Sequence, residues 1–366
     1  MQSFRSLLIL IIKRVVVKRL IICLWCMLVS TVALAQLESG RIHAVIINGG
    51  MNKLMNHERY WNDCAFLYRV LRNDYHIPKR DITLLISDGG SPDDDMLRSD
   101  GGGFASSSSD IDGDGERDVW LPATFNMVSS TLLALSRQLT VSDHLFLFLM
   151  DHGGSSDKQH DSFLYLWGGD KLTDTGLAAL LNQFNVKSMS IVLGQCYSGG
   201  FIDNLERSGR VITTACRGDE LSWSHPDKPF DSFAYHWICA IAGHDEKGVA
   251  VNADDNGDGW VTMDEAYRYA CQHECRPETP QYSSISLSLG ETWTFGKGGS
   301  DVRPVIVAHP ANGPAYDLLG RRLPYKPYKS YMSITPKNNN SYEEPADYNL
   351  CPSCRPKGRS SDNQRR

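Results

Sequence analysis

The sequence predicts an α/β fold in which helices cover both faces of a mostly parallel β-sheet. Between residues 41 and 275, short apolar runs alternate with segments of helical periodicity, which is typical of parallel strands joined by helices. Two of the apolar runs lead directly into glycine-rich turns, where open α/β sheets place their functional groups. With 366 residues, of which 42% are hydrophobic and 22% charged, the chain is long enough to bury a sizeable core.

Three strands and two helices are expected in the first half of this region. β-branched and apolar residues predict strands at 42–47 and 82–86, and a continuous apolar run predicts a buried strand at 144–150. Apolar residues spaced by three and four predict helices at 59–74 and 125–139. Because helices separate these strands along the chain, we expect the strands to pair in parallel.

The second half continues the alternation of strands and helices. Apolar runs predict strands at 188–193 and 210–215. Thr173 or Asp174 is placed to cap the first of the expected helices. Helical spacing predicts these helices at 173–184, 197–205, 230–242 and 264–273.

The N-terminal residues 1–35 have the features of an export signal. Basic residues between 13 and 19 precede the apolar run 20–32, and Ala33-Leu34-Ala35 supplies the small residues that a signal peptidase accepts. The alternative is an uncleaved membrane anchor, but the run is short for a span of ~20 residues. We therefore expect cleavage before Gln36, no stable membrane span afterwards, and a secreted, periplasmic or cell-surface protein.

The C-terminal part departs from the strand–helix pattern. Residues 276–325 are expected to form a β extension, with a pair of short strands within 283–295. Residues 326–366 form a polar tail rich in Pro and Asn, which predicts disorder. Tyr316-Asp317-Leu318-Leu319-Gly320-Arg321-Arg322-Leu323 resembles a segment found near the C-termini of secreted bacterial proteins with sorting domains, although it equally fits an exposed turn.

Cysteine spacing gives no dense disulfide framework. Eight cysteines remain once the signal removes Cys23 and Cys26. Cys271 and Cys275 lie four apart on an expected helix and share a face, which is a common core pattern. The lone Cys351-Pro-Ser-Cys354 motif fits either a disulfide or half of a zinc site.

The two glycine-rich turns carry a histidine and a cysteine. His152 follows the 144–150 strand and Cys196 follows the 188–193 strand, so the two residues meet at one edge of the sheet if these strands are neighbours. His152 can take the thiol proton, Gly153 can offer its N–H to a developing oxyanion, and the dipole of the 197–205 helix favours a thiolate. Taken alone, Cys196 could be a buried core thiol, and His152 could be a turn histidine that makes a local hydrogen bond. Together, on matched turns, they predict a catalytic dyad.

These motifs resemble the legumain family and its caspase and gingipain relatives. The resemblance rests on Asp151-His152-Gly153 and Gln195-Cys196-Tyr197-Ser198-Gly199-Gly200, each after an apolar strand, and it covers residues 41–275. It implies a caspase-like three-layer αβα sandwich and peptide-bond hydrolysis through an acyl-enzyme, with no metal in the chemistry itself. A membrane-bound relative transfers a GPI anchor, so transamidation is a second option.

The resemblance also implies a specificity pocket. Arg59 fits the family's arginine at the start of the first helix, and Ser222 and Asp231 fit its later serine and aspartate positions. The acidic residue before the nucleophile is replaced by Gly194 and Gln195, and a histidine after the arginine is replaced by Tyr60, which puts a preference for asparagine in doubt. An acidic floor formed by Asp231 or Glu220 suits a basic side chain equally well. The resemblance assigns Asn56 to orient His152.

Two acidic loops predict calcium binding. Residues 254–265 satisfy the EF-hand loop pattern, with side-chain oxygens from Asp254, Asn256, Asp258 and Glu265 and the carbonyl of Trp260. The insertion at residues 88–121 repeats the first half of this pattern in a bacterial-type aspartate-rich loop, without the closing glutamate. Its expected ligands are Asp110, Asp112, Asp114, Glu116 and Asp118. The alternative interpretation is that both loops are acidic turns that bind no metal.

These observations together predict an exported, calcium-stabilised cysteine endopeptidase that acts on peptides or proteins. A transpeptidase on the same fold is one alternative, and a non-catalytic calcium-dependent binding module is another. The net charge of -6 and pI near 6.0 argue against nucleic acid as a partner.

Overall fold

The computed structural model describes residues 40–156 and 161–296. The expected export signal (1–35), the part of the β extension beyond residue 296 and the polar tail (326–366) with Cys351 and Cys354 lie outside these residues. Within the described part, no helix is both long and apolar enough to cross a bilayer.

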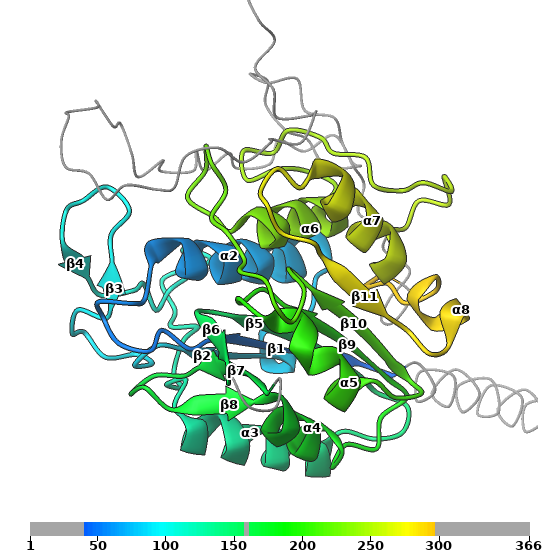
Figure 1. The fold of residues 1–366 in the computed structure, drawn as a ribbon, viewed down its shortest axis with the longest axis horizontal. Helices are drawn as coiled ribbons and strands as arrows, with labels where there is room; N and C mark the ends of the chain where they lie inside the picture. The colour runs from blue at the N-terminus through cyan, green and yellow to red at the C-terminus, as the bar shows by residue number, and fades with distance from the viewer. Residues whose placement is uncertain (1–39, 157–160, 297–366) are drawn as a thin grey trace, which may run out of the picture.

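A six-stranded sheet forms the centre of the molecule, with strand order β11-β10-β9-β5-β1-β2 (Figure 1). Neighbouring strands run parallel except for β10 and β11, which pair antiparallel at one edge. The strands span Ile42–Asn48 (β1), Ile82–Ile86 (β2), His144–Met150 (β5), Ser188–Leu193 (β9), Arg210–Thr214 (β10) and Gln281–Ser283 (β11). Five of them therefore lie at the positions that the sequence predicts.

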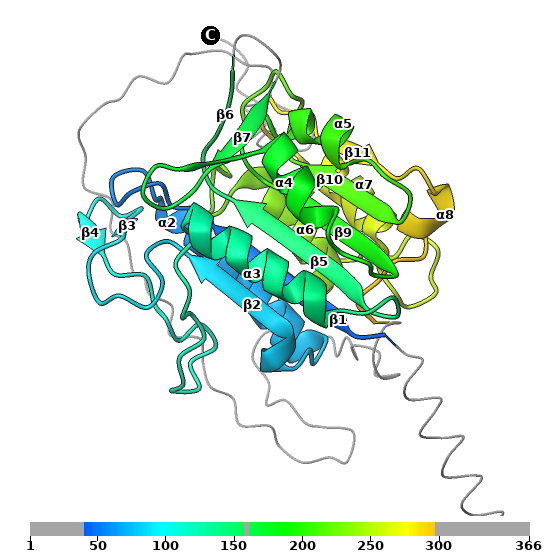
Figure 2. The same cartoon turned by 90° about the horizontal axis from the view of Figure 1, so that it is seen from below.

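Helices cover both faces of this sheet, which confirms the predicted three-layer αβα sandwich. Helices α2 (Glu58–Arg69), α6 (Ser232–Ala242) and α7 (Met263–His273) lie on one face (Figure 1). Helices α3 (Phe125–Gln138), α4 (Asp174–Leu181) and α5 (Ile202–Leu205) cover the other (Figure 2). Side-chain oxygens of Thr124, Thr173 and Thr262 cap α3, α4 and α7.

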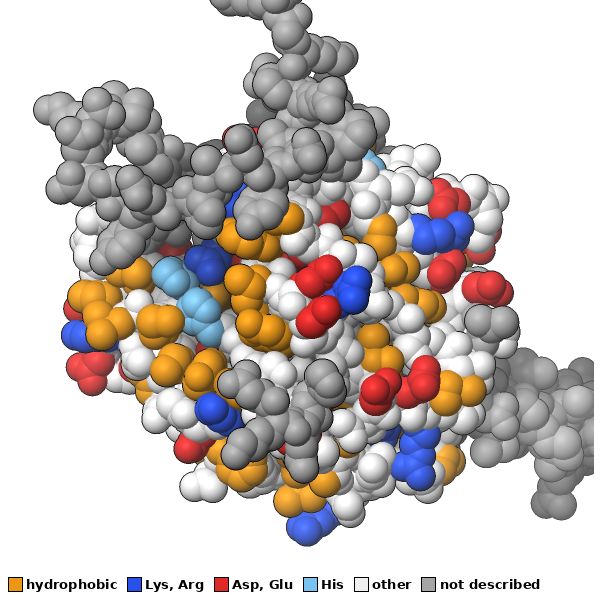
Figure 3. Space-filling view, in the orientation of Figure 1, with side chains coloured by type: hydrophobic (Ala, Val, Ile, Leu, Met, Phe, Trp, Pro, Cys, Tyr) orange, Lys and Arg blue, Asp and Glu red, His pale blue; other side chains and the backbone are white. Residues whose placement is uncertain are grey.

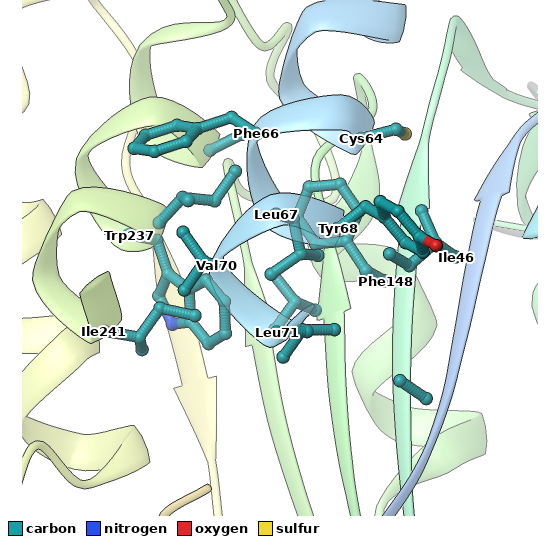
Figure 4. Packing of buried hydrophobic residues seen from close by; sticks show 14 of the residues in the cluster. Ile46, Cys64, Phe66, Leu67, Tyr68, Val70, Leu71, Phe148, Trp237 and Ile241 are labelled. Atoms are coloured by element: carbon teal, nitrogen blue, oxygen red, sulfur yellow. The ribbon is translucent and has the colours of Figure 1, made fainter. Parts of the chain in front are cut away.

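Strand alternation divides the core between the two faces. Along β1, Ala44 and Ile46 face the cluster that contains α2 and α6, whereas Val45 and Ile47 face the cluster that contains α3 and α4. In Figure 4, Leu67 and Leu71 of α2 lie between the strands and Trp237 of α6. This packing fixes α2, and with it the residues of its first turn, above the middle of the sheet.

Three segments differ from the sequence prediction. The expected helix at 197–205 is a 3₁₀ turn (Ser198–Phe201) followed by the four-residue α5, because Tyr197 adopts a left-handed backbone conformation with φ of 59°. Helix α2 ends at Arg69 and continues as a π-helical turn, Val70–Asp74. In place of the second expected strand within 283–295, the chain forms a short helix, α8 (Leu287–Gly290).

Two small sheets lie outside the central one. Strands β3 (Met96–Leu97) and β4 (Phe104–Ala105) form a hairpin in the 88–121 insertion. Strands β6 (Gly153–Ser155), β7 (Ser162–Tyr165) and β8 (Lys171–Thr173) form an antiparallel sheet that starts directly after His152.

We predict that Phe148→Ala lowers the free energy of unfolding by about 3–5 kcal/mol, because Phe148 is fully buried between the central strand β5 and α2. Denaturant titration followed by circular dichroism measures the change. Phe125→Ala is the control: Phe125 is 38% exposed, so its truncation should cost under about 1 kcal/mol. Equal losses in the two variants would contradict this assignment of the core.

Candidate active site

The turns that carry His152 and Cys196 are in direct contact. Strands β5 and β9 are parallel neighbours, with Leu149 paired to Leu193, so both chains leave the sheet at the same edge. A β-carbon at Gly153 would lie 2.1 Å from the carbonyl oxygen of Cys196, closer than any side chain can come. Glycine is therefore required at position 153, and its absence of a side chain lets the two turns pack backbone to backbone.

Backbone and side-chain atoms of Ser222 lie next to the thiol of Cys196. The N–H of Ser222 lies 3.4 Å from Sγ, and its hydroxyl and carbonyl oxygens each lie 3.7 Å away. Because α5 is only four residues long and starts six residues beyond Cys196, the helix whose dipole the sequence analysis invoked for the thiolate does not form there.

The ring of His152 is partly buried on the turn that follows β5. Burial, and next the positive charge of Arg59, lower the pKa of His152 to about 4, so the ring is neutral at neutral pH and can accept a proton. The backbone carbonyl of Met55 accepts a hydrogen bond from this ring. The His57 ring packs edge-on at 5.3 Å between centroids.

Asn56 does not contact His152, which corrects the role that the resemblance gave it. Its side chain is fully buried and donates to the Ser87 hydroxyl at 2.7 Å and to the Asp95 carbonyl at 2.8 Å. It also accepts from the Asn48 amide at 3.3 Å. Asn56 thus fixes the loop whose preceding residue, Met55, supplies the carbonyl for His152.

Tyr60 contacts His152, although the sequence marked Tyr60 only as a departure from the family pattern. Its hydroxyl lies 3.3 Å from Nδ1 and 3.4 Å from Nε2 of His152. Arg59 donates to the same hydroxyl at 2.8 Å, so the hydroxyl proton is free to point at the ring. Tyr60 is therefore a positioning residue for His152.

Arg59 and Asp231 form an ion pair next to the dyad. Nε of Arg59 lies 3.1 Å from Oδ1 of Asp231, whose side chain is only 6% exposed. Burial, and then the charge of Asp231, raise the pKa of Asp63, which accepts from the Asp231 N–H at 3.2 Å. Burial also raises the pKa of Asp231, whereas the charge of Arg59 opposes this shift and favours the charged form of Asp231. The structure thus brings Arg59, Asp231 and Ser222 to one edge of the sheet.

Glu220 is turned away from this group. Its carboxylate accepts hydrogen bonds from the N–H of Thr279 at 2.9 Å and from the hydroxyl of Thr279 at 3.0 Å. Its backbone carbonyl accepts from the N–H of Tyr197 at 2.8 Å. Glu220 therefore anchors the loop that carries Ser222, instead of forming the expected acidic floor.

Figure 3 shows one face of the molecule, on which histidine side chains lie among exposed hydrophobic ones. Leu54, Met55 and Leu221, which are neighbours in sequence of the residues around the dyad, are each more than one-third exposed. A separate pocket lies at the opposite edge of the sheet, where His144 and Ser188 begin β5 and β9. That pocket is therefore remote from the dyad.

The two acidic loops share one backbone arrangement. The first aspartate of each loop accepts from the N–H groups of two glycines with positive φ: Asp110 from Gly113 and Gly115, and Asp254 from Gly257 and Gly259. In each loop, the side-chain oxygens of the third and fifth residues accept from the backbone N–H of the residue two positions later. These acceptors are Asp112 and Asp114 in the first loop, and Asn256 and Asp258 in the second. These side-chain oxygens therefore turn into the loops, as cation ligands do.

Asp118 takes in the first loop the place that Glu265 takes in the second. One oxygen of Asp118 accepts from the N–H groups of Ile111 and Asp112. One oxygen of Glu265 accepts from the corresponding N–H groups, those of Asp255 and Asn256. Oxygens of Asp110, Asp112 and Asp118 lie within 4.8 Å of one another. Glu116 instead lies 3.8 Å from Lys79, and its side chain is 79% exposed.

We predict that the ring of His152 titrates with a midpoint near pH 4, well below the ordinary value of 6.5. Proton NMR of the histidine rings in Cys196→Ala measures this midpoint without catalysis. Arg59→Gln should raise it, because the positive charge that disfavours the imidazolium is removed. The double variant Arg59→Gln/Asp231→Asn, which leaves no unpaired buried charge, should shift it in the same direction. A midpoint near 6.5 in the parent would contradict the assignment.

Comparison with known protein families gives one match that supports cysteine-peptidase chemistry. Residues 134–253 match the Peptidase C13 family, a range that includes His152, Cys196, Ser222 and Asp231 but neither acidic loop. No protein of curated function matches the chain. A crystal structure of a structural-genomics target from Geobacter sulfurreducens aligns over 68% of this chain and 96% of its own, with 12% identity and a TM-score of 0.39. The family match supports a cysteine peptidase, and the chain is similar to the legumain family in the region of the dyad.

Proposed function

We propose that the protein is an exported cysteine endopeptidase in which Cys196 is the nucleophile and His152 the general base. The observation that carries this proposal is the contact between Gly153 and the Cys196 carbonyl, which places both residues on touching turns at one sheet edge. The family match over residues 134–253 and the N-terminal signal sequence support it.

The reaction follows from the position of these groups. His152, neutral at pH 7, accepts the Cys196 thiol proton while sulfur bonds to the scissile carbonyl carbon. The N–H of Gly153 is placed to hold the oxyanion. His152 then gives the proton to the leaving amine, and the C–N bond breaks. Water, deprotonated by His152, hydrolyses the thioester and restores the thiol.

The Arg59–Asp231 pair favours an uncharged polar side chain before the scissile bond. Arg59 balances the charge of Asp231, and Glu220 is held by Thr279, so neither acid is available as an unpaired partner for a basic side chain. A side-chain amide complements the Arg59–Asp231 pair, because its N–H can donate to the Asp231 carboxylate and its oxygen can accept from Arg59.

Calcium is the proposed structural cofactor of the two acidic loops. Asp110, Asp112 and Asp118 offer three gathered carboxylates, and residues 254–265 offer the full EF-hand ligand pattern on the same backbone arrangement. The first loop is tied to α2 by the Tyr68 hydroxyl, which donates to Asp118 at 2.7 Å. Calcium there would stabilise the helix that begins beside Arg59 and Tyr60, without taking part in bond cleavage.

We predict that the mature protein, with calcium and reductant, cleaves a diverse peptide mixture, and that Cys196→Ala lowers kcat/KM by roughly 1,000-fold or more. Mass spectrometry of the products identifies the residue before each cleaved bond. Cys271→Ser, at a half-buried thiol on α7, is the control and should keep full activity. Products joined to an added amine would indicate transamidation. Cleavage that survives in Cys196→Ala would overturn the proposed nucleophile.

We predict that saturating calcium raises Tm by about 5–10 °C over the chelated protein. Magnesium at the same concentration is the control and should do less, because these loops lack its strict octahedral geometry. Asp110→Asn and Asp254→Asn should each remove part of the shift. Differential scanning calorimetry that shows no calcium effect in the parent would refute the cofactor.

A further inference from the structure

A second group of metal-binding side chains lies apart from both acidic loops. His225, His236 and Cys275 place ligand atoms within 4.8 Å of one another. They come from three separate elements: the segment between β10 and α6, helix α6 itself, and the chain just after α7. We propose that this cluster binds a transition-metal ion of the zinc class, and that the ion fastens these three elements together. The proposal does not depend on peptidase activity.

The chemistry of the three ligands selects the class of ion. Two imidazoles and a thiolate suit borderline cations such as Zn²⁺ and are poor ligands for Ca²⁺, which requires oxygen. Nε2 of His236 is buried and has no hydrogen-bond partner. A buried ring nitrogen without a partner is costly, and a metal ion would satisfy it. Cys275 is 3% exposed, and its sulfur lies 3.8 Å from the Ser232 hydroxyl.

His225 must give up one hydrogen bond to bind the ion. Its Nδ1 accepts from the backbone N–H of Asp227 at 3.1 Å. A metal at Nδ1 would displace that donor, and a metal at Nε2 would require a proton on Nδ1, so either mode breaks this contact. The bond is exposed, so water replaces it for the N–H of Asp227 at small cost.

His273 is the candidate for a fourth ligand. It is the last residue of α7, two positions before Cys275, and its ring centroid lies 5.7 Å from that of His236. Its Nδ1 lies 2.8 Å from the Tyr269 carbonyl, to which it can donate. Metal-binding histidines commonly donate one ring N–H to a carbonyl in this way, which leaves the other nitrogen for the ion. Two imidazoles, a thiolate and this third imidazole complete a tetrahedral set.

The cluster is connected to the active site through one short hairpin. Ser224 and Asp231 pair antiparallel, and His225 donates its N–H to the Phe230 carbonyl at 2.8 Å. The same hairpin carries Ser222, whose N–H lies 3.4 Å from the Cys196 thiol. An ion at His225 therefore holds the segment that sets the position of Ser222.

Cobalt provides a direct test in the full mature chain that carries Cys196→Ala, Cys351→Ser and Cys354→Ser. These three changes remove the proposed catalytic thiol and the CxxC pair of the tail as competing ligands. We expect stoichiometric Co²⁺ to give a near-ultraviolet thiolate-to-metal charge-transfer band, and Zn²⁺ to abolish it by displacement. Cys275→Ser should remove the band, and His236→Ala should weaken Co²⁺ binding at least 10-fold. The acidic loops cannot produce the band, because they contain no sulfur.

Cys271→Ser is the matched control, because Cys271 is the neighbouring thiol on α7 and should leave the band intact. His225→Asn, on the surface hairpin, keeps the test valid if Cys275→Ser fails to fold, and it should also weaken Co²⁺ binding. The proposal is overturned by the absence of a charge-transfer band in the folded protein that carries Cys196→Ala, Cys351→Ser and Cys354→Ser. It is equally overturned by a band that persists in folded Cys275→Ser or disappears in Cys271→Ser.

Discussion

The active site depends on the contact between the turn after β5 and the turn after β9. Parallel pairing of these strands sends both chains out of the sheet at one edge, and Gly153 lets the backbones touch at Cys196. Any side chain at position 153 would clash with the Cys196 carbonyl oxygen and force the two turns apart. Strand order and one glycine therefore bring together the turns that carry the proposed catalytic pair, and the surrounding side chains adjust the chemistry of that pair.

Arg59 adjusts the site through three interactions. It pairs with Asp231, donates to the Tyr60 hydroxyl and, after burial, is the second cause that lowers the pKa of His152. One guanidinium thus links the proposed substrate pocket to the proposed general base.

The sequence predicted the strands and the dyad because apolar runs and glycine-rich turns are local patterns. It could not predict that Met55, rather than Asn56, contacts His152, because a backbone carbonyl leaves no mark on residue identity. The direction of Glu220 depends on Thr279, which lies far along the chain. The missing helix after Cys196 follows from the left-handed conformation of Tyr197, which a tyrosine rarely adopts.

The hairpin from Ser222 to Asp231 is the segment on which the separate parts of the site converge. Its first residue contacts the Cys196 thiol and its last residue pairs with Arg59. Between them, Trp223 donates its N–H to the buried Glu278 at 3.0 Å, and His225 belongs to the His–Cys cluster. Phe230 of this hairpin packs against Phe66 and Tyr235, and buried polar contacts with Arg59 and Asp63 hold Asp231. Near His225, by contrast, the hydrogen bond between Asp227 and His225 is exposed. A metal ion at His225 would therefore add an anchor between the residue that contacts the proposed nucleophile and the residue that pairs with Arg59.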